Sequence, residues 1–298
     1  MRIVDNVAAM RVLTNLGRTD RAIGRSTVRL SSGFRINTAG DDPAGFSISL
    51  KLRRQVASME MADRNTLDGT SLLETADAAL QDIHNMIQRM RELAVAASND
   101  TNTDEDRANI QEEIYGLLDE INDITRKVEF NNIRLLDGEA SNLHIQVGGR
   151  EGMTIPVSIP SFTTWSLGMT SDRWHRGLTS DDVDWLDPNL DLSTYDTWHL
   201  NVSTWGAAQQ AISMLDDALA RVSLNRAEIG ATINRFEYTS TSLRAATEAT
   251  ARSLSRIMDT DMAFEMMQLS KHNILSQAGM SILAQVNARP QQVLQLLG

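Results

Sequence analysis

Apolar residues between positions 73 and 97 are spaced alternately three and four residues apart without a break. The series consists of Leu73, Ala76, Leu80, Ile83, Ile87, Met90, Ala94 and Ala97. Such spacing places side chains on one face of a helix and is typical of a coiled-coil seam. Because no proline lies between Pro43 and Pro156, a helix over 43–98 is predicted, with Asp41 and Asp42 capping its start.

Two further series have the same alternation, one on each side of the middle of the chain. The first follows a polar turn at 99–104 and comprises Ile110, Ile114, Leu117, Ile121, Ile124 and Val128. The second comprises Ile212, Leu215, Leu219, Val222, Ile229, Ile233, Phe236 and Leu243, with polar interruptions at Arg226, Ser240, Thr247 and Thr250. Polar interruptions weaken a seam but can fix its register. The short turn predicts an antiparallel helix pair, along which the C-terminal helix packs.

A β-hairpin is predicted where 142–147 and 154–159 flank Gly148 and Gly149. Pro156 and Pro160 restrict the second strand to an edge. The predicted fold class is mainly α: an elongated antiparallel helical bundle or coiled coil, built from the N- and C-terminal regions, with a small β-hairpin region.

Both ends of the chain carry apolar residues that one chain does not cover. A first helix is predicted over 6–33, and the apolar residues of 257–298 spread around their helix instead of forming one face. We expect the two ends to pack against each other and against other copies of the chain. The residues predicted to form this polymerisation interface are Ile3, Val7, Met10, Leu13, Leu16, Met262, Met266, Leu269, Ile274, Met280, Leu283, Val286, Leu294 and Leu297.

The charges are distributed unevenly along the chain, whose net charge is −11. Residues 1–54 hold ten Arg or Lys against four acidic residues, and residues 55–135 hold seven against seventeen. A basic arm can contact nucleic acid or a membrane surface. Charge pairing with acidic helices in an assembly is favoured, because no aromatic stacking platform accompanies the arginines. We therefore predict neither a nucleic-acid nor a membrane partner.

Residues 161–205 differ from the rest because they hold all five tryptophans and seven Asp against two Arg. The tryptophans are Trp165, Trp174, Trp185, Trp198 and Trp205. They can form a small cluster against the bundle, which is the favoured interpretation, or a surface patch for a partner.

No enzyme is predicted. The absence of cysteine excludes disulfides, thiolate metal sites and a cysteine nucleophile. The histidines are scattered, and His175 and His199 with nearby Asp are a weak candidate for a metal site. No glycine-rich phosphate loop precedes a helix. We predict no catalytic, cofactor-binding or metal site, and no cofactor.

The motifs DTDMA, ILSQAG, SILAQVN and PQQVLQLL follow one another near the C-terminus. LSSGFRINTAGDDPAGFSIS spans 30–49, and IQRMRELAV spans 87–95. In this order they resemble the conserved ends of bacterial flagellins, over about 1–155 and 205–298. The resemblance implies a structural subunit that polymerises into the flagellar filament for motility.

The resemblance also implies a division of the chain and a set of partners. Residues 1–42 with 257–298 would form the inner filament core, 43–160 with 206–256 an outer-core bundle with the hairpin, and 161–205 a short variable insert. The implied partners are other copies of the chain, an export chaperone, the type III export apparatus, the filament cap and hook-junction proteins. The resemblance further implies an extracellular location in the flagellar filament. Because the first residues lack a continuous apolar stretch, we expect no cleaved signal peptide.

Arg89, Leu93 and Glu113 resemble the segment that a vertebrate Toll-like receptor recognises in some flagellins. The alternative is that they serve bundle packing and subunit contacts, which suits Leu93 best. Three rival functions also stay open: a hook–filament junction protein, a periplasmic flagellin, and a filament whose tryptophan-rich insert acts as an adhesion module.

Overall fold

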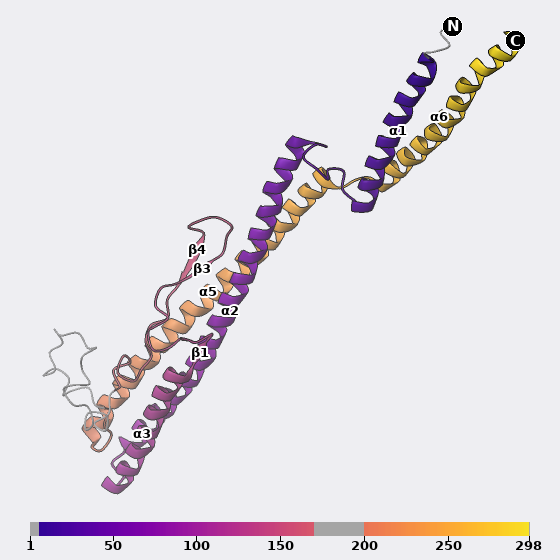
Figure 1. Ribbon diagram of the computed structural model, residues 1–298. Coiled ribbons are helices and arrows are strands. Elements are labelled where there is room, and N and C mark those ends of the chain that lie inside the picture. Colours follow the sequence, from indigo (N-terminus) through magenta and orange to yellow (C-terminus); the bar gives the residue numbers. More distant parts are fainter. Residues whose placement is uncertain (1–5, 170–199, 298) are drawn as a thin grey trace, which may run out of the picture. The chain divides into compact units, whose positions relative to one another are not determined.

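The computed structural model describes residues 6–169 and 200–297, with side chains described as far as residue 288. The helices of this part are α1 (Val7–Ser32), α2 (Pro43–Ala97), α3 (Asp104–Lys127), α5 (Trp205–Met258) and α6 (Met262–Leu297) (Figure 1). The strands form two antiparallel pairs, β1 (Glu129–Phe130) with β2 (Ile133–Arg134) and β3 (Leu143–Gln146) with β4 (Thr154–Val157). The predicted mainly α fold class with a small β-hairpin region is confirmed.

The chain divides into two compact units. Unit 1 comprises Met1–Ser58 and Ala245–Gly298, and unit 2 comprises Met59–Arg244. Helices α2 and α5 each contribute residues to both units. The three-part assignment into inner core, outer core and insert stays a prediction.

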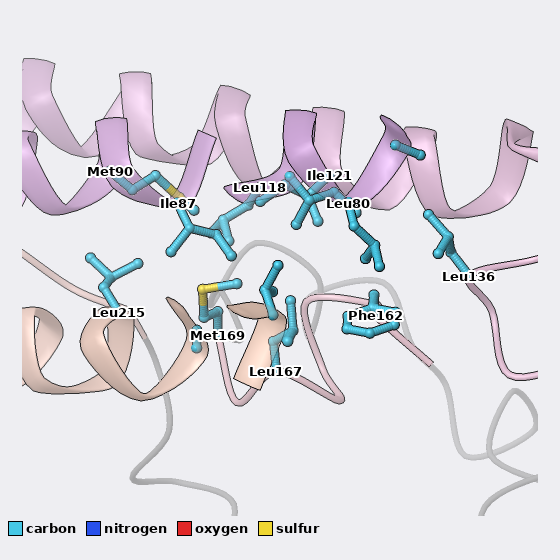
Figure 2. Packing of buried hydrophobic residues seen from close by; sticks show 14 of the residues in the cluster. Leu80, Ile87, Met90, Leu118, Ile121, Leu136, Phe162, Leu167, Met169 and Leu215 are labelled. Carbon is cyan, nitrogen blue, oxygen red and sulfur yellow. The ribbon is translucent and has the colours of Figure 1, made fainter. Parts of the chain in front are cut away.

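The seam predicted for α2 is the centre of the core of unit 2. All eight of its residues are buried, from Leu73 to Ala97. Figure 2 shows Leu80, Ile87 and Met90 packed in the same cluster as Leu118 of α3 and Leu215 of α5. The unbroken alternation predicted this face correctly because every position on it is apolar.

The buried face of α3 matches the predicted one in part. Ile114 and Ile121 are buried as predicted. Leu118 is buried, while Leu117 is only partly buried. Gln111, Asn122 and Thr125 are also buried, so three of the buried positions of α3 are polar. An alternation of apolar residues alone could not detect them.

Alanines shift the buried face of α5 in the same manner. Ala211 and Ala218 are buried, whereas their neighbours Ile212 and Leu219 are partly buried. Leu215, Val222, Ile229 and Phe236 are buried as predicted. Two small residues therefore occupy buried positions that the apolar alternation assigned to larger neighbours.

The polar interruptions of the α5 seam have partners on α2. Arg226 donates two hydrogen bonds to the Asp77 carboxylate, from Nε at 2.8 Å and from Nη2 at 3.3 Å. The Ser240 hydroxyl donates to Asp63 Oδ1 at 2.5 Å, and Arg244 Nε donates to Asp63 Oδ2 at 3.0 Å. These pairs favour one register of α5 against α2.

The segments on both sides of residues 170–199 belong to the core of unit 2. Figure 2 shows Phe162, Leu167 and Met169 among the residues of this core. Leu200 and Val202 are buried in the same cluster. The tryptophan-rich segment therefore begins and ends with core residues.

Two buried amides of α3 hold these flanking segments. Asn122 Oδ1 accepts hydrogen bonds from the Thr164 amide at 3.1 Å and the Thr164 hydroxyl at 3.0 Å. Gln111 donates to the Leu200 carbonyl at 3.1 Å and accepts from the Val202 amide at 2.7 Å. Buried amides satisfied in this way stabilise the fold, because an unpaired one would lose its hydrogen bonds to water.

The tryptophan cluster stays a prediction. Trp165 and Trp205 are exposed. The remaining tryptophans, Trp174, Trp185 and Trp198, lie outside the described residues, as do His175 and His199.

The predicted hairpin is confirmed, with Ile145 opposite Ile155 and His144 opposite Pro156. The β1–β2 hairpin was not predicted. Its turn consists of Asn131 and Asn132, which have positive φ angles of 50° and 65°. Asparagine tolerates this left-handed conformation better than most residues, so the Asn-Asn pair was the available signal.

The predicted capping of α2 is right for Asp42 and wrong for Asp41. Asp42 Oδ1 accepts a hydrogen bond from the Gly45 amide at 3.0 Å, within the first turn of α2. Asp41 Oδ2 instead accepts from the amide and hydroxyl of Thr38 and from the Asn37 amide. These bonds, those from Thr38 above all, hold the pKa of the Asp41 carboxyl below its usual value. Asp41 therefore stabilises the connector between α1 and α2.

Phe236 provides a test of the packing of unit 2. It is fully buried, and a Cβ added to Gly69 of α2 would lie only 3.1 Å from its Cε2 atom. Phe236→Ala should lower the free energy of unfolding by about 3–5 kcal/mol, because it leaves a cavity. The exposed Leu224 of the same helix is the control. Leu224→Ala should change the free energy of unfolding by less than about 0.5 kcal/mol. Denaturant unfolding followed by far-ultraviolet circular dichroism measures both, and equal effects would contradict this packing.

Candidate functional site

Helices α1 and α6 of unit 1 lie side by side and run antiparallel (Figure 1). Polar contacts join them at three levels. Asn6 Nδ2 donates to the Val286 carbonyl at 3.3 Å, and the Ser276 hydroxyl donates to Asp20 Oδ1 at 3.4 Å. Near the other end of the pair, Arg29 Nη1 lies 3.7 Å from Glu265 Oε2. The three contacts share one antiparallel register, in which each step forward in α1 matches a step back in α6.

One apolar stripe of each helix forms the contact between them. The predicted interface residues Leu16, Leu269, Leu283 and Val286 are half-buried. Gly279 of α6 lies beside Leu16 of α1, since a Cβ added to it would be in van der Waals contact with Leu16 Cδ1 at 3.5 Å. The expected packing of the two chain ends against each other is therefore confirmed.

The other predicted interface residues remain exposed in the single chain. They are Val7, Met10, Leu13, Met262, Met266, Ile274 and Met280. Ile3 lies outside the described residues, and so do the side chains of Leu294 and Leu297. The structure thus separates residues that join α1 to α6 from residues whose apolar side chains face solvent.

Further large apolar residues of the same helices are exposed and were not predicted. They are Val28 of α1 and Phe264, Met267, Leu275 and Ile282 of α6. Those of α6 lie next to a predicted residue or within one turn of one, whereas Val28 lies more than three turns from Leu16. The signal was present in the sequence, because α6 has large apolar residues on more sides than a single stripe requires.

The exposed apolar side chains of α6 lie in several directions around its axis. With 3.6 residues per turn, Met262 and Met280 share one direction, Met267 lies about 140° from it, and Phe264 about 200° from it. The half-buried residues Leu269 and Leu283 lie between the first and last of these directions, on the side of α1. A single further helix cannot cover all the exposed directions, so the geometry suits contacts with more than one neighbour.

Arg89, Leu93 and Glu113 of unit 2 lie close together but differ in exposure. Arg89 Nε and Nη2 donate to Glu113 Oε1 at 3.1 and 2.8 Å, and both side chains are about half exposed. The hydrogen bond to Glu113 raises the pKa of the Arg89 guanidinium above its usual value. Leu93 is buried in the core. The structure therefore places Leu93 in bundle packing and leaves Arg89 and Glu113 at the surface.

Residues 6–169 and 200–297 lack two features that would indicate other functions. No group of three or more His, Asp or Glu residues in this part of the chain is arranged to hold a metal ion. None of the helices described is both long and apolar enough to span a membrane.

Comparison with known proteins gives full-length matches. Residues 3–141 match the bacterial flagellin N-terminal helical region, and residues 212–297 match the bacterial flagellin C-terminal helical region. The chain is 40% identical over 310 residues to the flagellin of Bacillus subtilis and 39% identical over 297 residues to that of Halalkalibacterium halodurans. It is 36% identical over 298 residues to a flagellar filament core protein of Brachyspira hyodysenteriae. All of both chains is covered in each comparison.

Glu265 tests the pairing of α1 with α6. Its side chain is 7% exposed and that of Arg29 32% exposed, so solvent partly screens the pair. Glu265→Gln should weaken the helix pair by about 1 kcal/mol, which speeds amide hydrogen exchange in α6 roughly fivefold. Glu248→Gln is the control, because Glu248 is 70% exposed and lies 3.9 Å from Arg252 of its own helix. Unchanged exchange in the Glu265→Gln protein would show that this ion pair does not hold the helices together.

Proposed function

The chain belongs to the bacterial flagellin family and is a structural subunit of the flagellar filament, and we propose that the exposed apolar faces of α1 and α6 form the contacts between its subunits. The observation that carries this proposal is the incomplete cover of α6. Helix α1 covers one stripe of α6, and large apolar side chains such as Met266 and Ile274 stay exposed on the other sides. Soluble proteins rarely leave so much apolar surface uncovered unless it binds a partner.

A second copy of the chain is the partner that fits. The exposed residues of α1 and those of α6 form different surfaces, so a contact between two copies joins unlike faces. Contacts of this heterologous kind continue from copy to copy and generate a helical filament unless they close into a ring. Several apolar directions on α6 allow each copy to contact more than one neighbour, as a tube of packed helices requires.

The exposed apolar faces of α1 and α6 favour additional partners that act before assembly. A subunit with exposed apolar ends is prone to aggregate, so a chaperone that covers α6 would keep it soluble. We include in the proposal passage through the type III export apparatus without a cleaved signal peptide, followed by assembly beneath a filament cap onto hook-junction proteins. The flagellar filament is extracellular. Identity to flagellins over the whole chain favours the filament subunit over the junction protein.

Recognition by a vertebrate Toll-like receptor is a separate proposal. Arg89 and Glu113 are accessible from solvent and form a cross-helix pair of fixed geometry. Leu93 supports this surface from within the core and is not available to a receptor. A binding role for the tryptophan-rich insert also stays a proposal, with the exposed Trp165 and Trp205 at its ends.

The assembly proposal predicts the effect of charges on α6. The double variant Met266→Asp, Ile274→Asp should form no filaments, because each subunit contact would bury unpaired carboxylates. The helical content of the monomer should not change, since both side chains are exposed. Leu224→Asp places one carboxylate on an exposed apolar site of α5, and this control variant should still polymerise. Electron microscopy after seeded polymerisation measures the outcome, and normal filaments from the double variant would refute the proposal.

The receptor proposal predicts a loss of signalling when Arg89 is removed. Arg89→Ala should weaken activation of receptor-bearing reporter cells about tenfold, as expected when a well-placed arginine is lost from an interface. Arg244→Ala is the matched control, because Arg244 is also exposed and also pairs with a carboxylate of another helix. Full activity of the Arg89→Ala protein would remove the proposal.

A further inference from the structure

Most of the exposed methionines in the described part of the chain lie on α1 and α6. Every methionine of α1 and α6 is exposed, with 48–64% of each residue accessible to solvent. These five residues, named here the methionine surface, are Met10, Met262, Met266, Met267 and Met280. In the rest of the described chain, Met59, Met90, Met169 and Met258 are buried, Met86 and Met214 are partly buried, and only Met61 and Met153 are exposed.

The methionine surface coincides with the surface proposed to join subunits. Met262, Met266 and Met267 lie in the first two turns of α6, and Met280 shares the direction of Met262. Methionine suits such contacts, because its flexible thioether fills irregular gaps between helices. The same thioether is the one apolar side-chain group that mild oxidants convert into a polar one.

The reaction needs only a peroxide. A lone pair of the methionine sulfur attacks one peroxide oxygen, the O–O bond breaks, and the products are a sulfoxide and water. The sulfur loses two electrons and the peroxide gains them. The S=O group is a strong hydrogen-bond acceptor, so burying it against an apolar neighbour without a donor is unfavourable. Sulfoxides on the methionine surface would therefore oppose the contacts between subunits.

We propose that the methionine surface is a reversible oxidation site at which peroxides block polymerisation of the free subunit. The proposal rests on the proposed function, because it requires this surface to be covered in the filament. Free subunits are sensitive, since all five sulfur-bearing side chains are exposed. Subunits within a filament are protected by their neighbours. Methionine sulfoxide reductases, which act on each sulfoxide epimer, reverse the modification.

The first experiment compares oxidation of free subunits and of filaments. Both are treated with hydrogen peroxide, and sulfoxide formation is followed residue by residue by mass spectrometry. In the free subunit, the methionine surface should be oxidised about tenfold faster than the buried Met90 and Met169. In the filament, its rate should fall towards that of Met90, whereas slow oxidation in the free subunit or unchanged oxidation in the filament would overturn the proposal.

The second experiment measures polymerisation after oxidation. Oxidised wild-type subunits should show a critical concentration about tenfold higher than untreated subunits, and reductase treatment should restore it. If untreated subunits do not polymerise, the proposed function itself fails. If untreated and oxidised subunits polymerise equally well, only the oxidation proposal fails.

Two variants separate the methionine surface from other methionines. The variant with all five residues of the surface changed to Leu should polymerise equally well before and after peroxide. The control variant Met61→Leu, Met153→Leu removes two exposed methionines of unit 2 and should remain sensitive. A sensitive five-residue variant or a resistant control would overturn the proposal. If the five-residue variant does not polymerise when untreated, the test is the oxidised wild type. Recovery of its polymerisation after reductase treatment would support the proposal, and no recovery would overturn it.

Discussion

The terminal helix α6 has large apolar residues on all sides, and α1 covers only one of them. The proposals on assembly and on methionine oxidation both depend on that imbalance. The polar contacts from Asn6 to Val286 and from Arg29 to Glu265 fix which stripe of α6 faces α1. They thereby also fix which residues remain exposed. The helix pair is therefore a partly completed core, which other copies of the chain can complete.

In unit 2, helices of the same chain cover one another's apolar side chains. Helices α2, α3 and α5 bury a continuous apolar cluster, and the polar groups at its edges have partners. Asn122 and Gln111 satisfy backbone groups of the segments that flank residues 170–199, and Asp77 pairs with Arg226. Because these contacts are internal, unit 2 does not depend on neighbouring copies for its core. The contrast with unit 1 explains why the proposed assembly contacts lie on the terminal helices.

The sequence predicted the elements well wherever an apolar residue occupied every position of a buried face. The α2 seam, the β3–β4 hairpin and the limits of α1 follow from such local signals. The α3 seam was predicted correctly at Ile114 and Ile121 but not at its polar positions, because Gln111 and Thr125 are buried through hydrogen bonds that involve distant residues or the preceding turn. The sequence predicted which residues belong to the candidate interface. It did not predict which of them join α1 to α6 and which remain exposed. Whether Leu283 faces α1 or a neighbour depends on the register of two helices that are far apart in sequence.

Charge makes the apolar surface still more important for assembly. Unit 1 contains fourteen Arg or Lys against eight Asp or Glu, and unit 2 contains fourteen against thirty-one. Like units of neighbouring copies therefore repel each other when they approach, and salt reduces this repulsion by screening exposed charges. Burial of apolar area does not depend on the sign of either charge, and excluded salts such as sulfate strengthen it. Contacts made by Ile274, Met280 and their neighbours can thus join the terminal helices of neighbouring copies although these helices belong to units of like net charge.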